Sequence, residues 1–166
     1  NSLRYILRAT REGGRDTPGV LEAIETLRNC LKQSAHAADV DSLRGFEGVA
    51  GRAYFTALPA LLGDNVPEIM KLCGRNRRPP KDRFNALLSF GYALIYQSVL
   101  QAIKVVGLEP ALGFFHTPRS SAHPLVLDVM ELFRCPLWDI VLIGSVNRLQ
   151  WDTSEDFMET KPDLLT

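Results

Sequence analysis

Apolar residues recur along this chain at intervals of three and four, the spacing that places side chains on one face of an α-helix. The first clear run follows Pro18, a residue suited to the first turn of a helix, and fades in the small, polar segment 34–39, where His36 is expected at the surface. Before it, residues 2–12 predict a short helix or the end of an element, closed by a turn at Gly13 and Gly14. The apolar positions of the first run are Val20, Leu21, Ile24, Leu27 and Leu31.

A second helix is predicted from about Leu43 to Leu62, and Glu47 falls in the middle of its apolar stripe. A carboxylate there would be buried, and an unpaired buried charge costs several kcal/mol. Glu47 must therefore be neutralised, paired with an arginine or bound to a metal, and the pattern alone leaves these options open. The expected capping residues are Asp39, Asp41 and Ser42. The stripe consists of Leu43, Ala50, Tyr54, Leu58 and Leu61.

The connection 63–81 concentrates positive charge in its second half, and Pro79 with Pro80 should keep that half extended. A long basic loop predicts contacts with phosphate groups, although a solvated loop that contacts nothing has the same composition. Its basic residues, with the first one of the next helix, are Arg75, Arg77, Arg78, Lys81 and Arg83.

The longest helix is predicted from a cap at Asp82 to a stop at Gly107. Residues 84–103 carry no formal charge and are long enough to span a bilayer. Several Asn, Ser and Gln side chains make the segment too polar for that, so we expect a central helix surrounded by others. One side of it either borders a polar cleft or holds buried, satisfied polar groups. That side consists of Asn85, Ser89, Tyr92 and Tyr96.

A histidine and two acids come together in the segment 113–134. His116 ends a Gly-Phe-Phe run, and a helix beginning near Pro124 carries Asp128 and Glu131 on one side, one turn apart. Together with Glu47, these oxygen ligands and one imidazole suit Mg²⁺ or Mn²⁺ better than a structural zinc. Such a metal beside a basic loop fits phosphodiester chemistry. His123 is a competing ligand, but a capping role at the helix start explains it better.

A last apolar helix is predicted from Pro136 to about Leu149, followed by an acidic, polar tail at 151–166 that Phe157 anchors. No alternating strand pattern and no internal repeat is found. The fold class is therefore all-α, a compact bundle of five or six helices in one domain, residues 1–166.

Composition narrows the function only slightly. The chain has 46% hydrophobic and 23% charged residues, and its 19 basic and 19 acidic residues cancel, so net charge gives no argument for nucleic acid. Cys30, Cys73 and Cys135 lie too far apart for a zinc or disulfide pattern. Because no signal peptide precedes the first element, we expect a cytoplasmic protein. The first residue is Asn1 rather than Met, which suggests a piece of a longer protein.

Four segments carry a family resemblance, in the same order and with comparable spacing. They are LRGFEGVAGRAYF (43–55), NRRPPKDRFNALLSFGYALIY (76–96), GLEPALGFFH (107–116) and PLVLDVMELFR (124–134). With them, the sequence resembles the CRISPR-associated integrase, the first of the two universal spacer-acquisition proteins of prokaryotes.

That resemblance implies an all-helical catalytic domain that binds Mg²⁺ or Mn²⁺ through Glu47, His116 and Glu131, with Asp128 as a neighbouring acid and possible alternative ligand. It implies that Tyr54, Asn85, Tyr96 and Arg83 line the site or contact DNA. The implied reaction joins the 3′-hydroxyl of a prespacer to the CRISPR repeat by transesterification, with DNA cleavage when water attacks instead.

The resemblance also implies partners. Members form homodimers through a β-rich N-terminal domain that this chain lacks, and a small ferredoxin-like CRISPR-associated protein joins the dimers. We expect no membrane association. The parent chain could also be fused to a reverse transcriptase or another nuclease. Isolated, this chain is expected to bind DNA weakly. The alternatives are a non-enzymatic helical module that binds nucleic acid or protein through its basic loop, and a purely structural helical domain.

Overall fold

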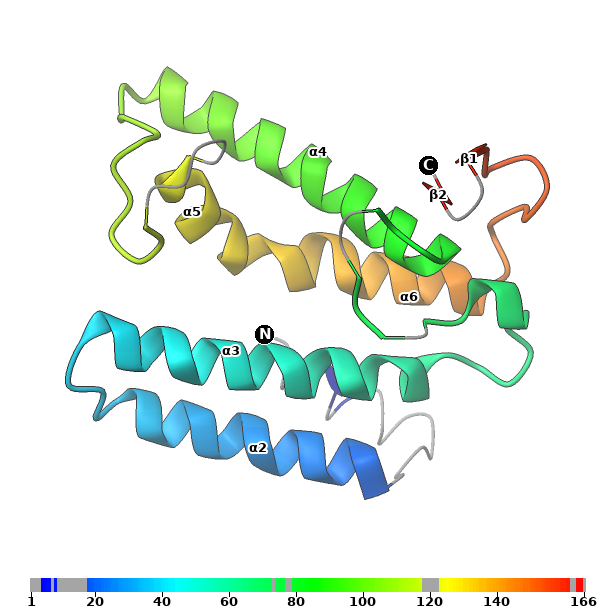
Figure 1. The fold of residues 1–166 in the computed structure, drawn as a ribbon, viewed down its shortest axis with the longest axis horizontal. Helices are drawn as coiled ribbons and strands as arrows, with labels where there is room; N and C mark the ends of the chain where they lie inside the picture. The colour runs from blue at the N-terminus through cyan, green and yellow to red at the C-terminus, as the bar shows by residue number, and fades with distance from the viewer. Residues whose placement is uncertain are drawn as a thin grey trace. The chain divides into compact units, whose positions relative to one another are not determined.

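The structure, a computed structural model, describes residues 4–6, 8, 18–72, 74–76, 79–117, 123–161 and 164–165. The chain divides into two compact units, whose residues can be located in Figure 1 by the colour bar. The first unit comprises Asn1–Ala86 and Ile143–Thr166, and the second comprises Leu87–Leu142. The boundaries between the two units fall inside two helices, and the single domain stays a prediction.

Helices account for nearly all regular structure in the described residues, so the predicted all-helical class is confirmed. A small antiparallel strand pair in the tail, in which Glu159 lies opposite Leu165, was not predicted. The elements are α2 (Pro18–Ser34), α3 (Val40–Ala57), η1 (Leu58–Leu61), η2 (Glu68–Met70), α4 (Arg83–Val105), α5 (Pro124–Arg134), η3 (Cys135–Asp139), α6 (Ile140–Asn147), β1 (Glu159–Lys161) and β2 (Leu164–Leu165).

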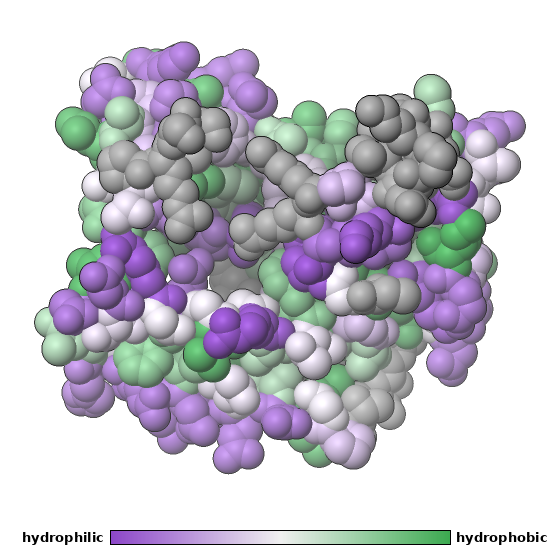
Figure 2. Space-filling view, in the orientation of Figure 1, coloured by the Kyte–Doolittle hydropathy of each residue, from purple (hydrophilic) through white to green (hydrophobic). Residues whose placement is uncertain are grey.

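In the first unit, α2 and α3 lie antiparallel side by side (Figure 1). Pro18 begins α2 as predicted, but Leu21 and Leu31 are exposed. The buried side is therefore rotated from the predicted one, because the face of α2 that α3 covers includes Ala23 and Cys30 in place of the two leucines. Its members are Val20, Ala23, Ile24, Leu27 and Cys30. Hydrophilic side chains gather along the outer edge formed by α2 (Figure 2).

Helix α3 begins where its cap was predicted. Asp39 is the N-cap residue, and its Oδ1 accepts a hydrogen bond from the backbone N–H of Ser42 at 2.7 Å. Asp41 does not cap and instead pairs with Arg44. The helix ends earlier than predicted, because Pro59 cannot donate the next helical hydrogen bond and the chain continues as the 3₁₀ turn η1.

In the second unit, α4 packs against α5 (Figure 1). Ile95, Val99 and Ile103 of α4 meet Val126 and Met130 of α5 in one apolar cluster. Among the described helices, α4 is the one that is long and apolar enough to cross a membrane by length and composition. Only 28% of its apolar window is buried, and Phe90 and Leu94 are exposed, so the prediction of a central helix surrounded by others is wrong.

The prediction that a new helix begins at Pro136 is wrong. Helix α5 continues through the π-helical turn η3 directly into α6. Pro136 has no N–H to donate to the preceding turn, and the backbone widens there until Ile140 N–H bonds to the carbonyl of Cys135, five residues back. The wide turn buries Asp139 and half-buries Trp138.

Candidate metal and DNA site

Asp128 organises the loop that carries His116. Its carboxylate is buried and faces the backbone of residues 114–116. Oδ2 accepts from the N–H groups of Phe114 at 2.7 Å and Phe115 at 3.1 Å. Oδ1 accepts from His116 N–H at 2.8 Å and lies 2.7 Å from the imidazole Nδ1. One carboxylate therefore fixes both the loop and the histidine ring.

This contact also determines which nitrogen of His116 is available. Burial pushes the pKa of Asp128 upward, and hydrogen bonds from Phe115, His116 and Phe114 outweigh it, so the pKa lies below its ordinary value. The carboxylate is thus ionised at neutral pH and can only accept hydrogen bonds. Nδ1 of His116 therefore donates, and in the neutral ring Nε2 keeps its lone pair for another ligand.

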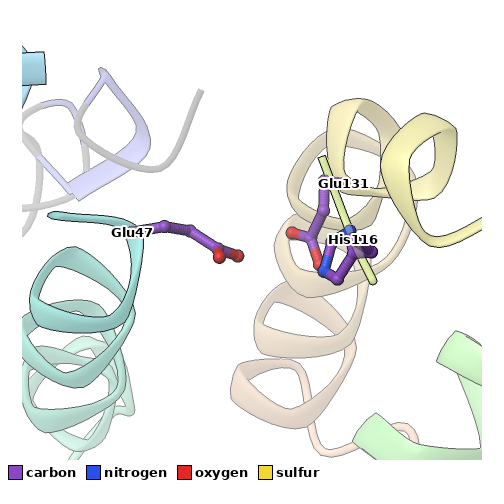
Figure 3. A group of neighbouring side chains, drawn as sticks. All are labelled: Glu47, His116 and Glu131. Atoms are coloured by element: carbon purple, nitrogen blue, oxygen red, sulfur yellow. The ribbon is translucent and has the colours of Figure 1, made fainter. Parts of the chain in front are cut away.

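His116 lies beside Glu131 in the second unit, as Figure 3 shows. A ring nitrogen of His116 and a carboxylate oxygen of Glu131 are within 4.8 Å of each other. Both side chains are half-buried. Glu131 Oε1 also lies 2.7 Å from Nη1 of Arg134, one turn further along α5. The second unit thus brings an imidazole and a carboxylate to one place, as the sequence predicted.

Glu47, the third residue drawn in Figure 3, extends from α3 of the first unit. Contrary to prediction, it is exposed, because the buried residues of α3 are Tyr54 and Ala57, near the other end of the helix. Glu47 is therefore not forced by burial to find a counter-charge. Within the described part of the chain, no salt bridge between Glu47 and an arginine is formed either.

Comparison with known proteins identifies the family. A family profile described as CRISPR associated protein Cas1 matches residues 1–165. The chain belongs to the Cas1 family. This confirms the resemblance seen in the sequence.

Two curated relatives illustrate the match. The chain is 54% identical over 162 residues to a Cas4 exonuclease/Cas1 endonuclease fusion from Leptospira interrogans, covering 97% of this chain and 29% of the relative. It is 40% identical over 161 residues to a CRISPR-associated endonuclease Cas1 from Moorella thermoacetica, covering 96% and 46%. The chain therefore spans less than half the length of these Cas1 relatives.

Solved structures agree on the fold. A Cas1 protein from Thermotoga maritima superposes with a TM-score of 0.78 at 29% identity, covering 99% of this chain and 49% of that one. A Cas6-RT-Cas1–Cas2 complex gives a TM-score of 0.82 at 27% identity, covering 99% and 18%. A casposase bound to integration product shares the fold at 23% identity, with a TM-score of 0.73, covering 99% and 44%.

Several residues that the resemblance to Cas1 assigned to DNA contacts serve the first unit's own structure. Asn85 is fully buried, and its side-chain amide bonds to Asp82, Arg75 and the backbone of Gly74 and Asn76. Asn85 thus ties the preceding loop to the start of α4 rather than facing solvent, and Asp82 caps the helix as predicted, because its Oδ1 accepts from the backbone N–H of Asn85 at 2.7 Å.

Two arginines of the predicted basic segment also contact residues of their own unit. Arg75 lies over the Phe55 ring at 5.7 Å, and Arg83 lies over the Phe157 ring at 5.3 Å. Both arginines are half-buried, whereas Lys81 is exposed. Tyr54 is also buried, beside Phe55. Arg77 and Arg78 lie outside the described residues. The described loop arginines thus hold aromatic rings in their own unit, and the composition of the loop could not reveal this.

The tyrosines of α4 hold the second unit together. The Tyr92 hydroxyl is 2.7 Å from Oδ1 of buried Asp139, and the Tyr96 hydroxyl accepts from the N–H of His123. The alternative of satisfied polar groups therefore holds for the two tyrosines, but the buried Ser89 hydroxyl has no hydrogen-bond partner among the described residues. His123 occupies the N-cap position of α5, but its side chain makes no capping hydrogen bond and stacks on Tyr96.

Sequence reasoning missed two members of this neighbourhood. Asp128 was expected to be a neighbouring acid or alternative ligand, and its role in holding the 114–116 backbone has no sequence signal. Arg134, by contrast, follows Glu131 by three residues on the same helix, a spacing that predicts an ion pair.

Proposed function

We propose that this chain is the catalytic part of a CRISPR-associated, metal-dependent DNA endonuclease and integrase. The observation that carries the proposal is the His116–Glu131 pair, in which Asp128 orients the imidazole. A histidine whose Nδ1 is bonded to a carboxylate and whose Nε2 is free is the usual arrangement of a metal-binding imidazole.

The donor set fits Mg²⁺ or Mn²⁺. His116 and Glu131 would hold the cation, and Glu47 of the first unit is proposed as the third ligand. One imidazole with carboxylate oxygens and no thiolate suits these metals. When bound, such a cation polarises a phosphoryl group and lowers the pKa of an attacking hydroxyl. Asp128, already engaged by four donors, serves as the positioning residue rather than as a ligand.

The proposed reaction is transesterification at a DNA phosphodiester. The 3′-hydroxyl of a prespacer attacks a phosphorus atom at the repeat boundary, a new P–O bond forms, and the existing P–O3′ bond breaks. The number of phosphodiesters is unchanged. When water attacks instead, the strand is cleaved, which agrees with the endonuclease names of the curated relatives.

DNA is accordingly the proposed substrate, with a homodimer and a small ferredoxin-like CRISPR-associated protein as proposed partners. Two of the similar structures are Cas6-RT-Cas1–Cas2 complexes, one of them partial, which supports this proposal. A cytoplasmic location remains a prediction. A non-enzymatic module acting through the basic loop is less favoured, because Arg75 and Arg83 turn toward rings of their own unit.

The test is cleavage of a branched DNA by the full-length protein in Mn²⁺. Glu47→Gln, His116→Ala and Glu131→Gln should each lower the rate at least about a hundredfold, since a metal ion supplies several kcal/mol. Glu22→Gln, an exposed carboxylate of α2, is the matched control and should leave the rate unchanged. Activity that survives EDTA, or that survives all three substitutions with helical circular dichroism intact, would contradict the proposal.

A further inference from the structure

Arg134 is held beside Glu131 by more than their ion pair. Its Cζ lies 4.9 Å from the centroid of the Tyr92 ring, a cation–π contact. The Tyr92 hydroxyl is in turn bonded to buried Asp139 at 2.7 Å, which fixes the ring. The guanidinium therefore rests on a rigid support contributed by α4, and it would keep its place if Glu131 released it.

The ion pair between Glu131 and Arg134 is weak enough for either residue to change partners. Nη1 of Arg134 lies 2.7 Å from Glu131 Oε1, and 23% of the Arg134 side chain and 30% of the Glu131 side chain are exposed. A partly exposed pair one turn apart shifts an equilibrium only about two- to five-fold. Arg134 also has spare donors, because its Nε–H is buried without a hydrogen-bond partner among the described residues.

A divalent cation and a guanidinium compete for the same carboxylate. A cation held by Glu131 would draw on the carboxylate oxygens that accept the Arg134 hydrogen bond, and its charge would repel the guanidinium. The planar guanidinium fork fits phosphate oxygens as well as it fits a carboxylate. Arg134 would then need a new anion. The proposed function supplies one, because it brings a DNA phosphate to the metal site beside Glu131.

We propose that Arg134 is a phosphate-binding residue that exchanges partners: it neutralises Glu131 before metal binds, and it binds a DNA phosphate once a divalent cation occupies that carboxylate. The inference rests on the proposed function, because that function supplies both the cation and the phosphate. It gives the Glu131–Arg134 pair a role beyond stabilising α5.

The exchange makes a prediction that needs no metal. Glu131→Gln removes the carboxylate charge and should release Arg134, so DNA affinity in EDTA should rise roughly three- to ten-fold, as expected for one additional hydrogen bond of ordinary net strength. The same substitution in the Arg134→Met background should have little effect, because no guanidinium is left to release. Methionine is chosen because its flexible side chain can keep packing on Tyr92.

The experiment is a double-mutant cycle on the full-length protein, read by fluorescence anisotropy with a labelled branched DNA in EDTA. Glu109→Gln, an exposed carboxylate of the second unit, controls for the change in net charge. Arg134→Lys keeps the charge and should retain part of the coupling. Thermal unfolding of every variant checks that each is folded.

The results of this cycle either support or overturn the partner exchange of Arg134. The exchange is supported if Glu131→Gln raises DNA affinity more than Glu109→Gln does, and only when Arg134 is present. Equal rises in DNA affinity in the wild-type and Arg134→Met backgrounds would mean simple charge repulsion and would overturn the exchange. A parallel Mn²⁺ titration, read by electron paramagnetic resonance, tests the proposed metal site separately. If Mn²⁺ binds through His116 while the gains are equal, only the exchange fails. If neither Mn²⁺ nor DNA binds, the proposed function fails and the exchange fails with it.

Discussion

At the residue scale, Asp128 shows why this position requires a carboxylate. Its two oxygens accept three backbone N–H groups and face Nδ1 of His116. An asparagine has the same shape but only one oxygen. Its NH₂ group would therefore face backbone N–H groups, and both are hydrogen-bond donors. Gly113 completes the contact, since an added Cβ there would lie 2.4 Å from Cβ of Pro124 and 2.9 Å from Oδ2 of Asp128.

We therefore expect Asp128→Asn to lower the free energy of unfolding by about 2–3 kcal/mol at neutral pH, the cost of losing a buried charged hydrogen-bond acceptor. Urea unfolding in metal-free buffer measures this. Asp64→Asn, an exposed aspartate, is the control and should have no effect.

The difference in free energy of unfolding between wild type and Asp128→Asn should depend on pH. The pKa of Asp128 is lowered in the folded state, so its stabilising contribution is fully present above its ordinary value of 3.8. That contribution is lost as pH falls through the lower, folded-state pKa, because the unfolded chain then binds more protons. A difference that stays constant down to the lowest pH at which the protein is folded would show that the carboxylate charge is not responsible.

At the element scale, the junction of α5, η3 and α6 determines how α4 is held. The π-helical turn half-buries Trp138, whose Nε1–H donates to the carbonyl of Leu87 in α4 at 3.0 Å. The indole also meets Phe90 edge-on. It lies so close to Gly91 that an added Cβ would fall 1.9 to 2.2 Å from three indole atoms. Gly91 is thus required by packing, not by backbone conformation.

Gly91→Ala should accordingly destabilise the protein by about 2–3 kcal/mol in chemical unfolding, since the anchored indole cannot move away. Gly45→Ala is the matched helical control: nothing lies within 4 Å of its added Cβ, so it should stabilise by about 0.5–1 kcal/mol. In a Trp138→Leu background the Gly91→Ala cost should largely vanish. An undiminished cost there would place the clash elsewhere.

At the scale of the whole molecule, the proposed ligands belong to different units: Glu47 to the first, His116 and Glu131 to the second. A cation that binds all three would stabilise the folded protein more than one held by the second unit alone. The free energy gained by a ligand that binds only the folded state follows directly from its concentration and affinity.

We expect Mn²⁺ at about a hundred times its dissociation constant to stabilise the protein by about 2.7 kcal/mol, which corresponds to a rise in Tm of about 5–10 °C for a chain of this size. At the same Mn²⁺ concentration, Glu47→Gln should reduce the rise, and Glu22→Gln should not. Differential scanning calorimetry with and without EDTA measures it. A full rise in Glu47→Gln, with none in His116→Ala, would exclude Glu47 from the ligand set.

The sequence by itself determined the all-helical class, the starts of α2 and α3, and the shared helix face of Asp128 and Glu131. These depend on local rules: a proline in the first turn at Pro18, a side-chain cap at Asp39, and residues three apart on one helix face. The family resemblance was also readable from four short segments. Such features need no knowledge of distant contacts.

Only the tertiary structure decided what depends on distant partners. Burial depends on which face another element covers, so Glu47 is exposed despite its apolar neighbours, and Leu21 and Leu31 face solvent. A basic composition does not say whether an arginine meets water or a ring, as Arg75 and Arg83 show. The role of Asp128 was hidden for the same reason, because the three N–H groups that it binds belong to residues twelve to fourteen positions away.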